Sequence, residues 1–159
     1  MRRMYGPFLE DPAALGLLIL RLVAGFGLIM HGYPKLVHAT SWMGTTSGVP
    51  GWLQAMSPVA EFGGGLALVF GLLTPLATLG IMCNMGVALF LVHFANRDPF
   101  VAPSGWTGAS YETAAMYLAI AFMFLLTGPG RHSIDHILFG GGRDDQRIAQ
   151  REREYARWR

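Results

Sequence analysis

The sequence predicts an all-α fold, an integral membrane four-helix bundle, and three observations lead to this fold class. Hydrophobic residues make up 52% of the 159-residue chain and charged residues 14%, whereas charged residues are about 25% of an ordinary soluble domain. Four apolar stretches approach or exceed the length of about 20 residues that crosses a bilayer as a helix. None of them alternates between polar and apolar positions as a half-buried strand would, so helices are predicted rather than strands.

The chain is divided into a bundle of residues 1–140 and a basic tail of residues 141–159. The four predicted membrane helices are residues 13–32, 58–73, 76–95 and 112–127. Pro12 suits the start of the first helix, and Ser57-Pro58 is typical of an N-cap followed by a proline at the first helical position. Gly32 and Pro34 predict an end or a kink of the first helix. The Gly128-Pro129-Gly130 run predicts the end of the fourth helix.

Positive charge is distributed unevenly along the chain, and this predicts the orientation in the membrane. With four spans, one side would hold Arg2, Arg3 and the seven arginines from Arg131 onward, while the other would hold only Lys35 and Arg97. The positive-inside rule therefore places both termini of this multi-pass protein in the cytoplasm. The tail 141–159 is predicted to be a solvated cytoplasmic flank, with a short helix on the membrane or on a partner as the alternative. Membrane lipid is the predicted environment of the four apolar helices. Nucleic acid is not a predicted partner, because no nucleic-acid motif occurs.

Several kinds of site are excluded by the residues that are present. The single cysteine, Cys83, excludes a disulfide scaffold, a cysteine zinc site and an intramolecular dithiol. No metal site is predicted, because the sequence contains neither an H-E-x-x-H motif nor an acidic cluster. The glycine run at residues 63–65 follows no predicted strand and precedes no P-loop lysine, so it predicts close helix packing rather than phosphate binding.

Ionisable residues of all four predicted helices fall at nearly the same depth, near the outer face: His31, Lys35, Glu61, His93 and Glu112. Arg21 precedes His31 by ten residues and so lies about 15 Å deeper along its helix. An unpaired arginine near the bilayer centre costs at least about 2.5–3.5 kcal/mol, so Arg21 is predicted to face the bundle and to find a carboxylate. Glu61 is the first candidate partner and Glu112 the second. The prediction is a polar pocket that opens to the outer face above Arg21; the alternative is that the outer residues simply sit in the headgroup region.

Five segments of the chain, taken in order, resemble the DoxX family of membrane proteins. The segment Leu18–Leu36 (LILRLVAGFGLIMHGYPKL) is similar to the first-helix signature of the family, and Glu61–Ala77 (EFGGGLALVFGLLTPLA) is similar to its second helix and turn. The later matches are LVHFANRDPF, the Tyr111-Glu112 pair and LTGPGRHSIDHILFG, which ends at Gly140. The resemblance covers nearly all of residues 12–140 and leaves out the tail.

The resemblance implies a four-helix inner-membrane protein, and it implies functions that the residues alone do not. The family takes its name from a subunit associated with thiosulfate:quinone oxidoreductase, and other members are linked to oxidative-stress complexes or to quinone detoxification. The family positions matched here are Arg21, His31, Lys35, Glu61, His93 and Glu112, which are also the positions of the pocket predicted from depth.

Three functions from different classes remain open. In the first, the chain is a quinone-linked oxidoreductase subunit whose pocket binds a quinone or another small molecule, with Glu61, His93 and Glu112 as candidate catalytic groups. Arg21, His31 and Lys35 complete the predicted binding set together with those three residues. In the second, the chain is an accessory subunit of a larger membrane complex and has no catalysis of its own. In the third, the ionisable residues belong to a transport or proton pathway, which lacks an obvious inward cluster.

Overall fold

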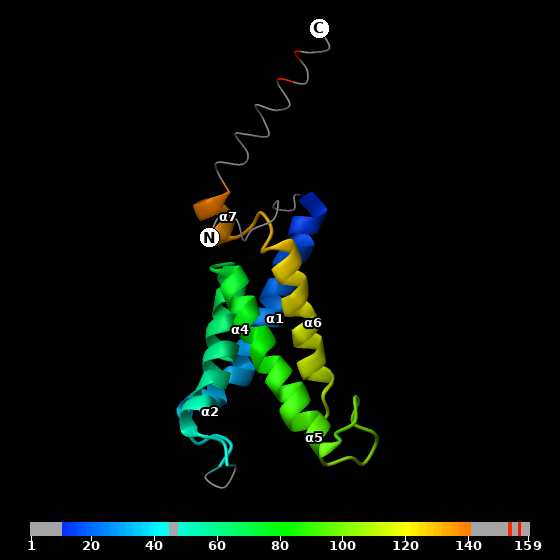
Figure 1. Ribbon diagram of the computed structural model, residues 1–159. Helices are drawn as coiled ribbons and strands as arrows, with labels where there is room; N and C mark the ends of the chain where they lie inside the picture. Colours follow the sequence, from blue (N-terminus) through cyan, green and yellow to red (C-terminus); the bar gives the residue numbers. More distant parts are fainter. Residues whose placement is uncertain (1–10, 45–47, 141–152, 154–155, 157–159) are drawn as a thin grey trace.

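The computed structural model describes residues 11–44 and 48–140, together with residues 153 and 156. Every regular element in this part of the chain is a helix (Figure 1), which confirms the all-α prediction. The two arginines at positions 2 and 3, and all but two residues of the predicted tail 141–159, lie outside the described residues.

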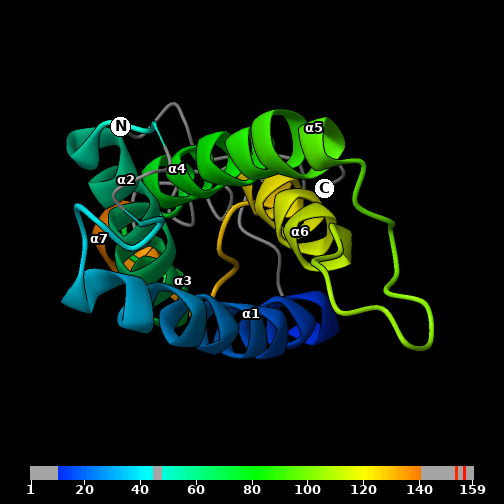
Figure 2. The ribbon, with the colours of Figure 1, turned by 90° about the horizontal axis from the view of Figure 1, so that it is seen from below.

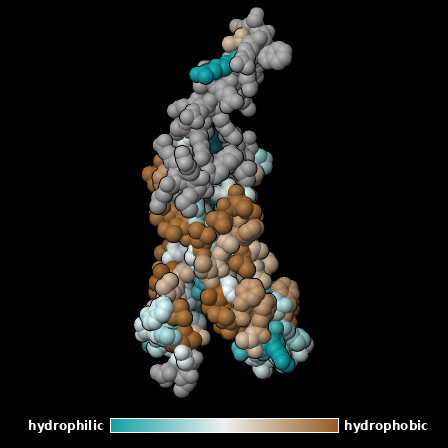
Figure 3. Space-filling view, in the orientation of Figure 1, coloured by the Kyte–Doolittle hydropathy of each residue, from teal (hydrophilic) through white to brown (hydrophobic). Residues whose placement is uncertain are grey.

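The membrane-spanning character of the bundle is confirmed by the length and hydropathy of its helical segments. Pro12–Val37, Gly51–Phe70 and Thr74–Asn96 are each long and apolar enough to cross a membrane. The fourth segment, Glu112–Thr127, is apolar but shorter; its 16 residues span about 24 Å at 1.5 Å per residue. Large apolar side chains cover much of the surface between the two ends of the molecule (Figure 3).

The first helix, α1 (Asp11–Val37), is longer than the predicted residues 13–32 because neither Gly32 nor Pro34 ends it. Gly32 instead lets α1 approach the next segment, since a β-carbon on it would lie 2.5 Å from the Phe62 backbone nitrogen. Pro34 stands inside the helix, near its end. Arg21, which was predicted to face the bundle, and Leu28 are each only 1% exposed, and Lys35 is partly buried.

The second rod begins earlier than predicted, and the predicted start at Ser57-Pro58 is wrong. It runs through α2 (Gly51–Pro58), a π-helical turn η2 (Val59–Gly63) and α3 (Gly64–Phe70). Proline has no N–H to donate to the carbonyl four residues earlier, which is why it usually begins a helix rather than continuing one. Here that carbonyl, of Gln54, accepts a hydrogen bond from the Trp42 indole nitrogen at 2.8 Å. A side chain from outside the helix thus replaces the missing donor.

The third rod is built in the same way as the second, from two α-helical segments joined by a π-helical turn. It comprises α4 (Thr74–Val87), η3 (Ala88–His93) and α5 (Phe94–Asn96), against a prediction of residues 76–95. The turn before it contains Gly71 at φ 61° and Leu73 at φ 49°, both in the left-handed region, so the chain reverses within a few residues.

The last two helices are α6 (Glu112–Thr127), with the predicted bounds, and a short α7 (Ile134–Phe139) that was not predicted. Ser133 caps α7, because its hydroxyl accepts from the His136 backbone N–H at 3.1 Å. The connection before α7 crosses α1, where a β-carbon on Gly130 would contact Leu17 at 3.2 Å.

Helix packing is closest between α1 and the second rod. Gly25 of α1 and Gly65 of α3 face each other, and a β-carbon on either would come within 2.8 Å of the carbonyl oxygen of the other. This confirms that the glycine run serves close packing. On the other side of the bundle, α6 packs against α4 (Figure 2). The core between the helices contains Leu28, Leu68, Ile81, Met85 and Phe124.

The two ends of the bundle differ in structure. At one end, called here the α7 end, the start of α1, the turn before α4 and α7 lie together (Figure 1). At the other, called the loop end, two long connections extend from the bundle, residues 38–50 and residues 97–111. Figure 3 shows the molecule forked at the loop end, with a hollow between two lobes. One lobe contains α2, and the other contains α5 and the connection 97–111 (Figure 1).

Candidate functional site

The centre of the polar cluster at the loop end is an ion pair between Lys35 and Glu61, called here the Lys35–Glu61 pair. The Lys35 ammonium lies 2.6 Å from Glu61 Oε1 and 2.7 Å from Oε2. The Glu61 side chain is 6% exposed and the Lys35 side chain 25% exposed. The carboxylate is therefore almost withdrawn from solvent and lipid, while the ammonium remains accessible.

Two further side chains from different helices donate to the same carboxylate oxygen. Asn84 Nδ2 of α4 donates to Glu61 Oε1 at 3.0 Å, and Ser57 Oγ of α2 donates to it at 3.4 Å. Oε2 receives only the Lys35 bond among the contacts described, so this oxygen retains acceptor capacity. Glu61 stands in η2, and such π-turns are frequent at functional sites.

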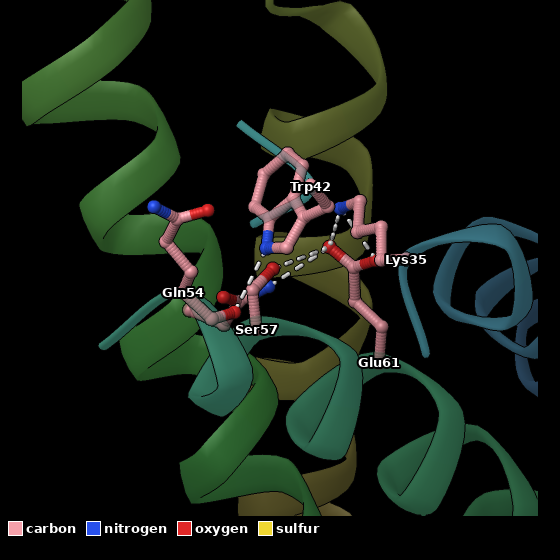
Figure 4. Close-up of polar contacts among 6 residues, drawn as sticks. Lys35, Trp42, Gln54, Ser57 and Glu61 are labelled. Atoms are coloured by element: carbon pink, nitrogen blue, oxygen red, sulfur yellow. Dashed lines mark hydrogen bonds and ion pairs between the residues drawn. The ribbon is translucent and has the colours of Figure 1, made fainter. Parts of the chain in front are cut away.

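Trp42, in the connection that follows α1, covers the Lys35–Glu61 pair on the side of the loop end. The Trp42 ring lies over the Lys35 ammonium, 4.7 Å from it (Figure 4). Gln54, which is 4% exposed, holds this connection in place. Its side-chain oxygen accepts from the Met43 backbone N–H at 3.0 Å, and its side-chain nitrogen donates to the Val49 carbonyl at 2.8 Å.

His31 reaches the same region through Tyr117, a residue that the sequence analysis did not single out. The His31 and Tyr117 rings meet edge to face with their centroids 5.9 Å apart. Tyr117 is also close enough to Glu61 for an electrostatic interaction. The available signal for Tyr117 was a phenol five residues after Glu112 in the fourth apolar stretch, whereas Trp42 stands outside the four predicted helices.

His93 and Glu112 belong to the other lobe of the loop end. His93 Nδ1 lies 2.7 Å from Asp98 Oδ2, and the two side chains are 17% and 11% exposed. Glu112 is exposed at the start of α6, and its backbone N–H donates to the Phe100 carbonyl at 3.0 Å. His93 completes the second π-turn, η3, so each lobe combines a π-turn with a contact between a basic and an acidic side chain.

Arg21 does not pair with Glu61, and that prediction is wrong. Its Nη2 atom donates to the His132 backbone carbonyl at the α7 end, and Asp135 is the carboxylate with which it interacts electrostatically. The reason is geometric: side chains of a helix lean toward its N-terminus, and the N-terminus of α1 is at the α7 end. Arg21 therefore leans away from Glu61, and it does not form the floor of a pocket around Glu61.

Asp135 completes the polar cluster at the α7 end. Its two carboxylate oxygens accept from the backbone N–H groups of Leu73 and Thr74, at 2.7 and 2.8 Å. Its own backbone N–H donates to the Gly71 carbonyl at 2.8 Å. Gly71 also packs against the Arg21 guanidinium so closely that a β-carbon there has no room. Asp135 and Arg21 thus fasten α7 and its connection to the turn before α4.

Comparison of the chain with known proteins finds one matching family and two similar proteins. The model of the DoxX family matches residues 16–94. The chain is similar to the inner membrane protein YqjF of Escherichia coli (strain K12), with 34% identity over 139 residues, covering 82% of this chain and 95% of that protein. It is also similar to an uncharacterized protein of Haemophilus influenzae, with 27% identity over 124 residues, covering 77% of this chain and 90% of that protein. No solved structure matches the chain significantly.

Proposed function

The chain belongs to the DoxX family, and from that premise we propose that it binds the head group of a membrane quinone at the Lys35–Glu61 pair. In this proposal it is a subunit of a redox system in the bacterial inner membrane. The printed name of its Escherichia coli relative supports the inner-membrane location. The arginine distribution supports an orientation with both termini in the cytoplasm and the loop end outside.

The observation that carries the proposal is the nearly buried Glu61 carboxylate with an accessible lysine bound to it. A charged pair inside a membrane span is costly, and such residues generally serve a ligand, an ion or a proton. Lys35, Ser57 and Asn84 all donate toward one carboxylate oxygen. They therefore hold Glu61 in place while the second oxygen accepts a donor from a ligand.

The two groups of the pair match the two redox forms of a quinone head group. A quinone carbonyl accepts from the Lys35 ammonium, and a quinol hydroxyl donates to Glu61 Oε2. Reduction of the quinone consumes two electrons and two protons. The electrons come from an electron-transfer protein of the same redox system and the protons from water at the loop end. The Lys35 ammonium is the group of the pair that carries a proton to the reduced quinone oxygen, and in the reverse oxidation the Glu61 carboxylate accepts the proton of the quinol hydroxyl.

Native mass spectrometry of the protein released from lipid nanodiscs containing quinone tests the proposal. We expect a bound quinone on the wild-type chain and its loss in Lys35→Gln. Arg131→Gln is the matched control, because it removes one positive charge from an exposed residue at the α7 end and keeps the quinone. Wild-type protein without quinone, or equal retention in Lys35→Gln, would contradict the proposal.

An accessory-subunit function is the second candidate, and one surface supports it. The connection 97–111 exposes Phe100, Val101 and Trp106 to 49%, 54% and 46%. Exposed apolar residues on a connection outside the helices suit a protein partner. The same mass spectra, recorded on protein mildly extracted from its own membranes, report this. A stoichiometric partner that persists in Lys35→Gln but is lost in Trp106→Ser would favour the accessory function.

A further inference from the structure

The helices of the bundle pack against each other to different extents, and α1 and α6 make few contacts with each other. In the described ranges 11–44 and 48–140, α1 packs against η2 and α3, and α6 packs against α4. Figure 2 shows α1 and α6 as separate rods, with the connection to α7 passing between them at one end. The line along which they face each other is called here the α1–α6 seam, defined by Gly27, His31 and Tyr117.

Tyr117 bridges the α1–α6 seam with its side chain. Its hydroxyl reaches Gly27 of α1, and a β-carbon on Gly27 has no room beside it. Its ring meets the His31 ring edge to face. Deeper in the bundle, apolar side chains of both helices, among them Leu28 and Phe124, belong to one core. At the level of Gly27 the bridge is made by the Tyr117 phenol, and a rotation of this side chain would open the seam there.

The polar groups of the seam are unusual for a surface that faces lipid. His31 is exposed and Tyr117 is half-buried, and both stand in segments that are otherwise apolar. A polar side chain that faces hydrocarbon is costly unless it has a partner or a function. Lys35 follows His31 by four residues and so lies on the same face of α1.

Behind Tyr117 lies the Lys35–Glu61 pair. Lys35 stands one helical turn beyond His31 on the same face of α1, and its ammonium binds Glu61, so the seam leads toward the pair. The alternative approach, from the loop end, passes the Trp42 ring that covers the Lys35 ammonium. Gln54 fixes that cover through both of its side-chain atoms. The closure toward the bilayer thus includes the Tyr117 side chain, whereas the closure toward the loop end is Trp42, whose connection is braced by Gln54.

We infer that the ligand enters sideways from the bilayer through the α1–α6 seam, with Tyr117 and His31 as contact residues for its polar ring. This inference rests on the proposed function and names the ligand class more narrowly. The ligand has a polar ring that reaches the Lys35–Glu61 pair and an apolar tail that stays among the lipid chains between α1 and α6. A quinone with an isoprenoid tail has this form.

Photolabelling of the full chain in lipid nanodiscs tests the route. The probe is an azidoquinone with a decyl tail, competed with an excess of unlabelled decylquinone, and labelled peptides are mapped by mass spectrometry. We expect saturable labelling at residues 27–31 and 113–117. Saturable labelling confined to the connection 38–50 would overturn the lateral route and leave the proposed function standing. Absence of saturable labelling anywhere would overturn both.

A hydroxyl deletion gives an independent readout of Tyr117 as a binding residue. Tyr117→Phe keeps the ring and removes the donor, and we expect the Kd for decylquinone to rise about three- to tenfold, as for one lost hydrogen bond. Tyr33→Phe is the matched control, since Tyr33 is 60% exposed on α1 and its ring lies 6.5 Å from the Phe62 ring instead. An unchanged Kd in Tyr117→Phe, or an equal rise in both variants, would contradict the contact.

Discussion

The two ends of the bundle each hold a cation and a carboxylate, but they use them differently. At the α7 end, Arg21 and Asp135 bond to backbone groups: the His132 carbonyl and the N–H groups of Leu73 and Thr74. At the loop end, Lys35 and Glu61 bond to each other through their side chains. Bonds to backbone groups hold a turn in place and must remain for the fold to persist. A pair of side chains can exchange partners with a ligand.

The comparison also explains why the α7 end needs a carboxylate. Leu73 has a left-handed φ of 49°, a conformation that costs about 1–3 kcal/mol in a residue with a β-carbon. Asp135 offsets this cost by accepting from both N–H groups at the start of α4, where the helix dipole also favours negative charge. The burial of Asp135, 0% exposed, is therefore a structural requirement, whereas Lys35 at the loop end remains accessible.

The largest effect is expected at the α7 end. Asp135→Ala leaves two N–H groups of the α4 start without their acceptor and leaves Arg21 without a compensating charge. We expect a loss of about 3–5 kcal/mol of stability, as for the removal of one partner from a buried pair. Unfolding by denaturant in detergent micelles measures it, with Asp135→Asn as the milder variant that keeps one acceptor oxygen. A loss of stability below about 1 kcal/mol in Asp135→Ala would contradict the structural role of Asp135 at the α7 end.

The next effect concerns binding at the loop end. Glu61→Gln removes the charge that accepts from a quinol hydroxyl, and we expect the Kd of decylquinol to rise about tenfold to a hundredfold, as for a hydrogen bond to a charged group. Its stability should fall by less than that of Asp135→Ala, because the accessible Lys35 can turn to solvent. Titration in nanodiscs gives the Kd, and denaturant unfolding gives the stability. The reverse order of stabilities would count against the account.

A smaller effect sharpens the role of Trp42. Trp42→Phe removes the indole donor to the Gln54 carbonyl, and we expect a stability loss of about 0.5–1.5 kcal/mol. In a Pro58→Ala background the alanine N–H supplies the missing donor, so the same substitution should cost less. A double-mutant cycle by denaturant unfolding measures the coupling between the two residues. Additive losses would show that the indole does not replace the proline donor.

The smallest effect distinguishes two glycines of α1. Gly27→Ala displaces the Tyr117 hydroxyl, whereas Gly16→Ala places its β-carbon in open space. We expect a Kd for decylquinone raised about two- to fivefold in the first variant only, because part of one hydrogen bond is lost. Both variants gain the same helix propensity from the change of glycine to alanine. A lower stability of Gly27→Ala than of Gly16→Ala would therefore measure the strain at the seam. Equal Kd values would leave Tyr117 without a role in binding.

The sequence predicted the helical class and the inward orientation of Arg21, because periodicity and depth depend on local spacing. It did not predict that the second rod begins at Gly51, because the donor that makes Pro58 acceptable comes from Trp42, outside the helix. Such compensation is a tertiary contact and leaves no trace in the spacing of helix signals.

The candidate site was predicted in part. Depth alone placed Lys35 and Glu61 at one end, and the structure brings them into contact. The Arg21 prediction failed because depth gives no direction, and the direction of a helical side chain is set by the helix N-terminus. The roles of His31, His93 and Glu112 stay predictions. The π-turns that hold Glu61 and His93 were not predicted, since a one-residue change in hydrogen-bond register has no clear pattern in sequence.

The most direct test of the difference between the two ends is a decylquinol titration of three proteins in the same nanodiscs: wild type, Glu61→Gln and Asp135→Asn. The Kd of decylquinol is determined per folded molecule, with the folded fraction taken from circular dichroism. The account predicts that Glu61→Gln weakens binding about tenfold or more, while Asp135→Asn keeps the wild-type Kd and loses stability. Weakened binding in Asp135→Asn, together with a wild-type Kd in Glu61→Gln, would contradict it.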